Sequence, residues 1–421
     1  MPTLLAATRK TFLALRVRNY RLYFGGQVIS ATGTWMHTVA LGLLVLSSRL
    51  HGNGLNVGVV VALQFVPILL FGSWGGLVVD RMDKRRLLVA TQSALAVLAL
   101  ALGLLVATDV ITMWEVYVVA TMFGVVNLFD NPGRQTFVSE MVGRELLPNA
   151  VSLNSVVMNA ARVIGPAIGG VLIFTIGIAA CFLFNAASYL AVLAALLAMR
   201  PGELHPAPLV ERAGGQVRDG LRYVWRTPSL RRPLLALAVV GVFAFNFTTT
   251  LPLLAERTFH GGAGTYSALT GAMGVGAVIG GLLIAHRSRP SERFLSAIGI
   301  GFGVMLVAVG LSPDEPLALV ALVGMGVCSI GYIATSNATL QLRADPVMRG
   351  RVMGLFAIAF LGSTPIGGPL VGWISDVSSP RVAILVGAVA TLAVTVSLAL
   401  ASRRPPVEPG RPVAVPQELA A

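Results

Sequence analysis

Long apolar runs alternate with short polar connectors along most of the chain. Residues 54–79 contain no charged side chain, and neither do residues 87–107. Each run has about the 20 apolar residues that a helix needs to cross a bilayer. Helices are the expected form, because backbone polar groups find no water in hydrocarbon. The pattern predicts twelve spans, at residues 21–47, 54–79, 87–107, 114–131, 148–175, 178–198, 233–255, 265–285, 294–312, 317–340, 351–374 and 381–401.

The connector between the second and third runs is a dense cluster of charge. It carries two acids and four cations in a short space: Asp80, Arg81, Asp83, Lys84, Arg85 and Arg86. The connector is too short to be a domain and too charged to enter lipid, so we expect a tight turn at a membrane face. Its excess of basic residues favours the cytoplasmic face.

The basic residues of the other connectors support the same topology. With the N-terminus inside, the inside segments hold 27 of the 31 Lys and Arg residues. The outside connectors hold only Arg49, Arg257 and Arg381, and Arg162 lies within a span. This asymmetry predicts a multi-pass protein of the plasma (cytoplasmic) membrane with both termini cytoplasmic.

The longest connector divides the spans six and six, and the two halves echo each other. Gly165-Pro166 and Gly169 in the fifth span recur as Gly368-Pro369 and Gly372 in the eleventh. Duplicated six-helix halves are typical of transporters that bind substrate between the halves. We therefore expect an N-terminal half at 1–198, a cytoplasmic linker at 199–232, a C-terminal half at 233–402 and a disordered tail at 403–421.

Composition excludes several other classes of protein. Charged residues make up 12% of the chain, hydrophobic residues 55%, and the mean hydropathy is +0.80, whereas soluble domains have about 25% charged residues. The net charge of +13 does not indicate nucleic-acid binding, because the cations are spread over alternate connectors. The two cysteines, Cys181 and Cys328, have no metal or redox spacing.

Enzyme chemistry has little support in the sequence. The two lysines, Lys10 and Lys84, lie in no phosphate-binding loop, and no nucleophile-elbow, zinc-protease or CxxC motif occurs. We expect no catalytic residues, no cofactor and no bound metal. An enzyme acting on lipid is disfavoured for the same reason.

Arg162 is the least expected residue on physical grounds, because a charge deep in a span is costly and usually faces a cavity or a partner. It shares a helical stripe with Asn159, and the pair is a candidate for the cavity. A structural arginine that caps carbonyl groups between helices is the alternative.

The first span has a second polar stripe, formed by Gln27, Thr34 and His37. The charge of a histidine changes near physiological pH, so His37 is a candidate for proton coupling. A hydrogen-bonded packing histidine is the alternative. Asp130 and Arg134, one turn apart, predict either a local ion pair or a gate contact with the region of the fifth span.

The charged connector resembles a motif of the major facilitator superfamily, in the loop between its second and third helices. The matching residues are Gly76, Asp80, Arg81, Arg85 and Arg86. The chain departs from the motif at Asp83, where the family usually has Gly. The resemblance covers nearly the whole chain, and it implies an all-α membrane protein of twelve helices in two six-helix halves. It also implies a gating role for this loop.

A closer resemblance lies around the fifth span. The run with Gly165, Pro166, Gly169 and Gly170 is similar to the antiporter motif of the superfamily, and its surroundings resemble the branch of siderophore exporters and drug efflux proteins. Many members of this branch carry an acid where this chain has Thr34, so the role of that acid in proton coupling does not carry over.

These features together predict a monomeric secondary transporter that works by alternating access. The resemblance implies proton-coupled efflux of a small amphipathic molecule, such as a drug or siderophore-like compound, with the lipid bilayer as the other partner. A solute importer of the same fold is the alternative, since direction is not encoded by the fold. A non-transporting membrane receptor or assembly protein is a further alternative, although the chain has no sizeable soluble domain for signalling.

Overall fold

The computed structural model describes residues 12–205, 216–285, 291–346 and 348–401, and all regular elements in these ranges are helical. The predicted tail at 403–421 lies outside them. The helices are η1 Leu13–Arg16, α2 Arg18–Leu46, α3 Gly54–Arg81, α4 Lys84–Ala107, α5 Met113–Thr175, α6 Ile178–Ala198, η2 Pro201–Glu203, α7 Gln216–Arg226, α8 Pro228–Phe243, α9 Phe247–Leu253, η3 Leu254–Thr258, α10 Ala263–Ala285, α11 Glu292–Leu311, α12 Glu315–Arg343, α13 Arg349–Leu361, α14 Thr364–Val377 and α15 Pro380–Ala401.

Eleven segments of the described chain are long and apolar enough to cross a membrane, one fewer than predicted. The difference lies in α5, whose 63 residues include both the fourth and the fifth predicted spans. A straight helix of that length would extend about 95 Å, three times the hydrocarbon thickness of about 30 Å. Dividing α5 at its kink accounts for the twelfth span.

The kink in α5 lies at Gly143, which has φ 69° and ψ 176°. This backbone conformation is open to glycine and costly for other residues. Pro148 lies five residues further on, inside the second segment. The segment 132–147, predicted as a connector between spans, is therefore helical on both sides of one glycine, which corrects that expectation.

Two other predicted spans are each built from two helices. The seventh consists of α8 and α9, and Asn246 stands at the break between them. Its side-chain amide donates to the carbonyl of Val242 at 2.7 Å, which satisfies a carbonyl group that the broken helix leaves unpaired. The eleventh consists of α13 and α14, and Gly367 of α14 lies close against Val242 and Asn246.

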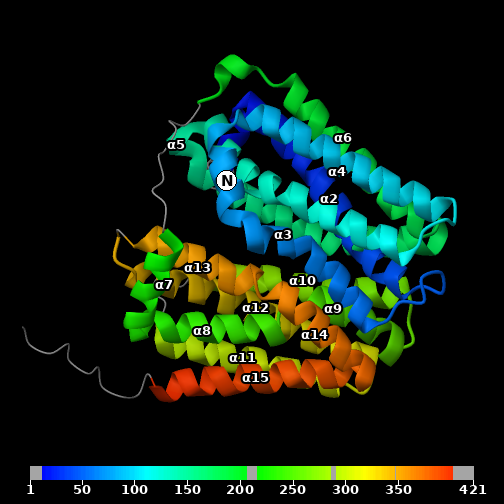
Figure 1. The fold of residues 1–421 in the computed structure, drawn as a ribbon, viewed down its shortest axis with the longest axis vertical. Helices are drawn as coiled ribbons and strands as arrows, with labels where there is room; N and C mark the ends of the chain where they lie inside the picture. Colours follow the sequence, from blue (N-terminus) through cyan, green and yellow to red (C-terminus); the bar gives the residue numbers. More distant parts are fainter. Residues whose placement is uncertain (1–11, 206–215, 286–290, 347, 402–421) are drawn as a thin grey trace, which may run out of the picture.

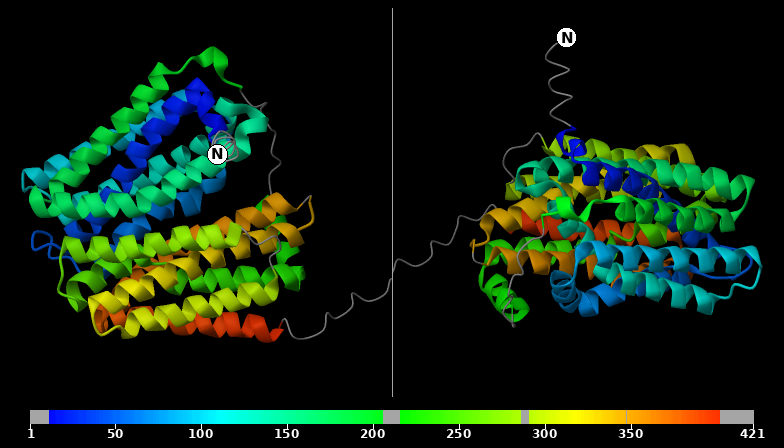
Figure 2. Two further views of the ribbon diagram at one scale, coloured as in Figure 1. Left: turned by 180° about the vertical axis from the view of Figure 1, so that it is seen from behind. Right: turned by 90° about the horizontal axis from the view of Figure 1, so that it is seen from above.

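The helices form two bundles that lie side by side (Figures 1 and 2). The first bundle contains α2–α6 and the second α8–α15, while α7 packs against α13 and α8. The bundles meet mainly through α3 with α14 and α5 with α10. We name the two ends of the molecule after acids there: α3 begins at the Asp376 end and finishes at the Asp80 end.

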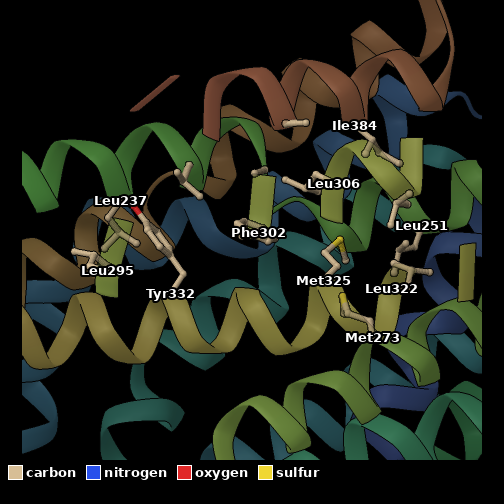
Figure 3. Packing of buried hydrophobic residues seen from close by; sticks show 14 of the residues in the cluster. Leu237, Leu251, Met273, Leu295, Phe302, Leu306, Leu322, Met325, Tyr332 and Ile384 are labelled. Atoms are coloured by element: carbon tan, nitrogen blue, oxygen red, sulfur yellow. The ribbon is translucent and has the colours of Figure 1, made fainter. Parts of the chain in front are cut away.

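The largest apolar core lies within the second bundle (Figure 3). Phe302 of α11 and Tyr332 of α12 are fully buried in it, and Leu237 of α8 packs between the helices. A separate cluster around Leu44, Leu102 and Phe182 fills the first bundle. Each bundle therefore holds a core of its own, while the domain limits at residues 198 and 233 stay predictions.

The contact between α3 and α14 depends on glycines from both helices. A Cβ atom on Gly58 would lie 2.2 Å from the carbonyl oxygen of Gly368, and one on Gly372 would lie 2.1 Å from that of Gly54. Since real Cβ atoms do not approach carbonyl oxygens so closely, the crossing excludes any side chain at these positions. Small residues are the usual means of such close approach between membrane helices.

We predict that Gly58→Ala destabilises the protein, by about 1–3 kcal/mol for the overpacked crossing. The matched control is Gly72→Ala on the same helix, where no described atom lies within 4 Å of the new Cβ. Both changes bring the same gain in helix propensity of up to about 1 kcal/mol. Melting temperatures in detergent should fall for Gly58→Ala and stay level or rise for Gly72→Ala; equal values would contradict the crossing.

Candidate functional site

The charged connector forms two helix caps at the Asp80 end. Asp83, the departure from the superfamily motif, is the N-cap of α4, and its carboxylate accepts from the backbone N–H of Arg86 at 2.8 Å. Arg85 donates to the carbonyls of Leu196 and Leu197, at 2.8 and 3.3 Å. These carbonyls end α6, where a cation also complements the helix dipole. The partners of Arg85 are thus carbonyl groups at the end of α6.

The other motif residues lie around the end of α3. Arg81 and Arg86 are exposed, Asp80 is partly buried, and the carbonyl of Asp80 accepts from the ammonium of Lys84 at 3.2 Å. Gly76 has no described atom within 4 Å of its Cβ position. No described neighbouring helix therefore packs closely against Gly76 in this structure.

Asp130 and Arg134 form an ion pair within α5. The Asp130 carboxylate is fully buried and also accepts from Thr91 at 2.7 Å and from Gln92 at 2.8 Å, both on α4. Arg134 also donates to Gln27 of α2 at 2.8 Å. The local pair is therefore present, and its outside partners come from α2 and α4 rather than from the second segment of α5.

The stripe predicted on the first span is divided among three environments. Gln27 joins the ion pair, and the hydroxyl of exposed Thr34 donates to the carbonyl of Ser30 at 2.9 Å. His37 is buried between the rings of Phe123 and Phe182, with centroids at 4.9 and 5.0 Å. These three residues do not meet in one site.

Arg162 lies at the junction of three helices. Its guanidinium carbon stands over the ring of Trp35 of α2, 5.1 Å from the ring centroid. Its Cγ lies 3.5 Å from the Cβ position of Gly274 on α10 of the second bundle. Its Nε is buried and has no hydrogen-bond partner among the described residues. The side chain is half-buried, whereas Asn159, one turn earlier, donates to the carbonyl of its own helix at Ser155.

The glycines of the antiporter-like run are contact points for two neighbouring helices. A Cβ on Gly165 would lie 2.5 Å from that of Trp35, and Gly169 faces Met36, so α5 packs closely on α2. A Cβ on Gly170 would lie 2.5 Å from the hydroxyl oxygen of Ser267 on α10, across the bundles. Pro166 is buried within the same segment. The run therefore fixes the position of α5 against both bundles.

A groove of about 870 Å³ runs between α5 and α10. Its walls are small or apolar, with Ala167, Val171 and Phe174 on one side and Ala268 and Gly271 on the other. Val171 and Phe174 are largely exposed at its rim. The groove suits apolar groups.

One contact between the bundles was missed in the sequence. The carboxylate of Asp376 on α14 accepts from the backbone N–H groups of Gly54 and Leu55, at 2.7 Å each. These are unpaired donors of the first turn of α3, where a negative charge is favoured. Arg257 donates to the same carboxylate at 2.7 Å. The sequence did contain a signal for this contact: Asp376 lies just after the second Gly-Pro run, at the start of an outside connector that has few cations.

Comparison with known proteins identifies a family whose sequence pattern this chain matches. The family described as transmembrane secretion effector matches residues 9–414. The staphyloferrin A transporter of Staphylococcus aureus is 24% identical over 371 residues, covering 85% of this chain and 89% of that protein. The multidrug efflux pump Tap of Mycolicibacterium fortuitum is 29% identical over 366 residues, covering 82% and 87%. The enterobactin exporter EntS of Shigella flexneri is 26% identical over 332 residues, covering 78% and 77%.

Solved structures show the same fold at low sequence identity. A bacterial homologue of the human lysosomal transporter Spinster, in an inward-facing and unoccupied conformation, superposes with a TM-score of 0.69 at 14% identity, covering 91% of this chain and 95% of that chain. The nucleoside transporter NupG superposes with a TM-score of 0.73 at 10% identity, covering 92% and 100%. The two-bundle arrangement is therefore the fold of major facilitator transporters.

We predict that Asp130→Asn lowers stability strongly, because it leaves Arg134 without its counter-charge; breaking a buried pair costs about 3–5 kcal/mol. The double variant Asp130→Asn with Arg134→Gln should recover part of the loss, since it leaves no unpaired charge. Melting temperatures of both single variants and of the double variant give the interaction energy between Asp130 and Arg134.

The matched control for this cycle is Glu203→Gln, which removes the acid of an exposed i,i+3 pair with Arg200. Exposed pairs contribute about 0–1 kcal/mol, so this variant should melt near the wild type. Additive effects of the two changes in the Asp130–Arg134 cycle would contradict a coupled buried pair.

Proposed function

Because the chain belongs to the transmembrane secretion effector family of the major facilitator superfamily, we propose that this transporter exports small amphipathic molecules in exchange for protons. The family and the relatives are membrane transporters rather than enzymes. The proposal adds the direction of transport, the coupling ion and the class of substrate. It also places a monomer in the plasma membrane with both termini in the cytoplasm.

The observation that carries an alternating-access mechanism is the difference between the two ends of α3. At the Asp376 end, α3 is joined to the second bundle by glycine contacts and by the Asp376 carboxylate. Towards the Asp80 end, Leu70 and Trp74 are 66% and 57% exposed. A protein closed at one end and less packed at the other has the form of one state of a two-state transporter.

Under this proposal the two ends of the molecule are gates, and one is closed while the other is open. Asp376 and Arg257 hold the outer gate shut, and the loop with Gly76 and Asp80 belongs to the inner gate. Closing the inner gate would bring a helix of the second bundle against the open face of Gly76. Release of the Asp376 contacts would leave the first N–H groups of α3 without protein acceptors. Water can replace these acceptors only when the outer end is open.

Transport itself is tested in proteoliposomes with an imposed pH gradient and a panel of amphipathic compounds. We expect substrate movement opposite to the proton flow, and its loss when a protonophore collapses the gradient. Movement in the same direction as protons would identify an importer instead. Efflux that continues in cells after the gradient is collapsed, with ATP as the only energy source, would exclude proton coupling.

We predict that Asp376→Asn opens the outer end. The amide keeps the size of the carboxylate, but it has one acceptor oxygen and no charge for Arg257 or the α3 terminus. Spin labels at Trp114 and Leu317, exposed residues near the first residues of α5 and α12, should report a longer distance or a larger long-distance population.

The control is Asp109→Asn, which removes an acid paired with Arg49 at 2.9 Å within the first bundle. This change should leave the label distance unaltered, and Arg257→Gln should give a smaller opening than Asp376→Asn. An unchanged distance in Asp376→Asn would show that the carboxylate does not hold the two bundles together.

A further inference from the structure

Arg162 is a cation within a span, and the other predicted spans supply no free anion for it. Only two acids, Glu115 and Asp130, fall within the twelve predicted spans. Glu115 accepts from the backbone N–H of Thr112 at the start of α5, and Asp130 is paired with Arg134. Arg162 itself lies 13 residues before the end of α5 at Thr175, about 20 Å along the helix. A counter-charge from a neighbouring span is therefore not available to it.

Arg162 also makes no substitute contact with carbonyl groups in the described chain. Arg381, which likewise has a buried unbonded Nε, donates through Nη2 to the carbonyl of Ser312 at 2.6 Å. No such bond from Arg162 occurs among the described residues. A charged group in hydrocarbon without a partner is costly, so the structural role of capping carbonyls does not account for Arg162.

The surroundings of Arg162 hold the guanidinium and leave its edge available. Trp35 holds the group by a cation–π contact, with the guanidinium carbon 5.1 Å from the ring centroid, and the N–H groups of Arg162 have no hydrogen-bond partner among the described residues. The N–H fork of an arginine matches the two oxygens of a carboxylate. On the α10 side, Gly274 packs closely on the first part of the Arg162 side chain, since a Cβ there would lie 3.5 Å from Arg162 Cγ and 2.9 Å from Val163. The residue is half-buried, so its head is not sealed within the first bundle.

From these observations we propose that Arg162, held over the ring of Trp35, binds a carboxylate of the transported molecule at the junction of α2, α5 and α10. The proposal rests on the transport function above and deepens it: the exported amphipathic molecules carry an anionic group. Because the site includes α10 of the second bundle, its bound anion would contact both bundles. Trp35 is then a positioning residue that orients the guanidinium.

The test compares two probes of the same size and shape, 2-naphthoate and 2-naphthamide, in binding to the purified full-length protein by equilibrium dialysis. The wild type should bind the carboxylate at least about tenfold more tightly, as expected for a charge-assisted bidentate contact. Arg162→Gln should abolish the difference. Arg162→Lys should keep part of it, because an ammonium retains the charge but not the fork.

Arg231→Gln is the matched control. Arg231 also stands over a tryptophan, 5.8 Å from the ring centroid of Trp225, but this tryptophan is 56% exposed and the pair lies outside the predicted spans. This variant should bind both probes as the wild type does. Trp35→Leu should weaken naphthoate binding while leaving some preference for it, because the charge remains. Melting temperatures identify any variant that has failed to fold. If Arg162→Gln fails to fold, the comparison of Arg162→Lys with the wild type still tests the proposal.

A second arm repeats the dialysis with sodium chloride in place of the naphthalene probes, because an inorganic anion is the other source of negative charge. Chloride binding that depends on Arg162, without any preference for naphthoate over naphthamide, would overturn the proposal in favour of a halide site. The absence of a charge preference in the wild type, or its survival in Arg162→Gln, would overturn it as well. If the wild type prefers naphthoate but transports nothing in proteoliposomes, the transport function is rejected while the anion site stands.

Discussion

Polar groups within a bilayer have no water to bind, so the protein must supply a partner for each of them. The arrangement of the two bundles follows from how this requirement is met. The carboxylate of Asp130 is satisfied by Arg134, Thr91 and Gln92, which ties α5 to α4. At the break in the seventh span, the side chain of Asn246 takes up a carbonyl group that the missing helical turn would have used.

The same requirement joins the bundles at one end. The first N–H groups of α3 have no partners within their own helix, and Asp376 of the other bundle supplies two of them. A partner that comes from the opposite bundle is lost when the bundles separate. Such a contact depends on how the bundles meet, whereas the caps formed by Asp83 and Arg85 lie wholly within the first bundle.

Backbone contact through glycine has a related consequence. The crossing of α3 and α14 at Gly58 and Gly368 places backbone against backbone, with no long side chains to interlock. Flat surfaces of this kind hold helices close by van der Waals contact, but they present little obstacle to sliding or separation. The two Gly-Pro runs are thus used differently: Gly165 packs on α2 of its own bundle, and Gly368 packs on the other bundle.

Arg162 differs from the paired charges Asp130 and Arg134, because the described chain contains no anion or carbonyl group bonded to it. A residue that violates a local rule without compensation inside the protein is a sign of function. The ligand would then complete the set of partners that the folded chain leaves unfilled, and its binding energy would depend on how the two bundles meet.

The sequence by itself determined that the chain is a series of apolar helical spans, most of their approximate limits and the resemblance to a transporter superfamily, because apolar length and charge are local properties of a segment. It also isolated Arg162, since no span offers that residue a free acid. Tertiary structure decided which polar groups meet. The separation of Gln27, Thr34 and His37 into three environments depends on helix rotation, which short polar stripes specify weakly. The contact of Asp376 with Gly54 joins residues far apart in the chain, and only the packing of the two bundles brings them together.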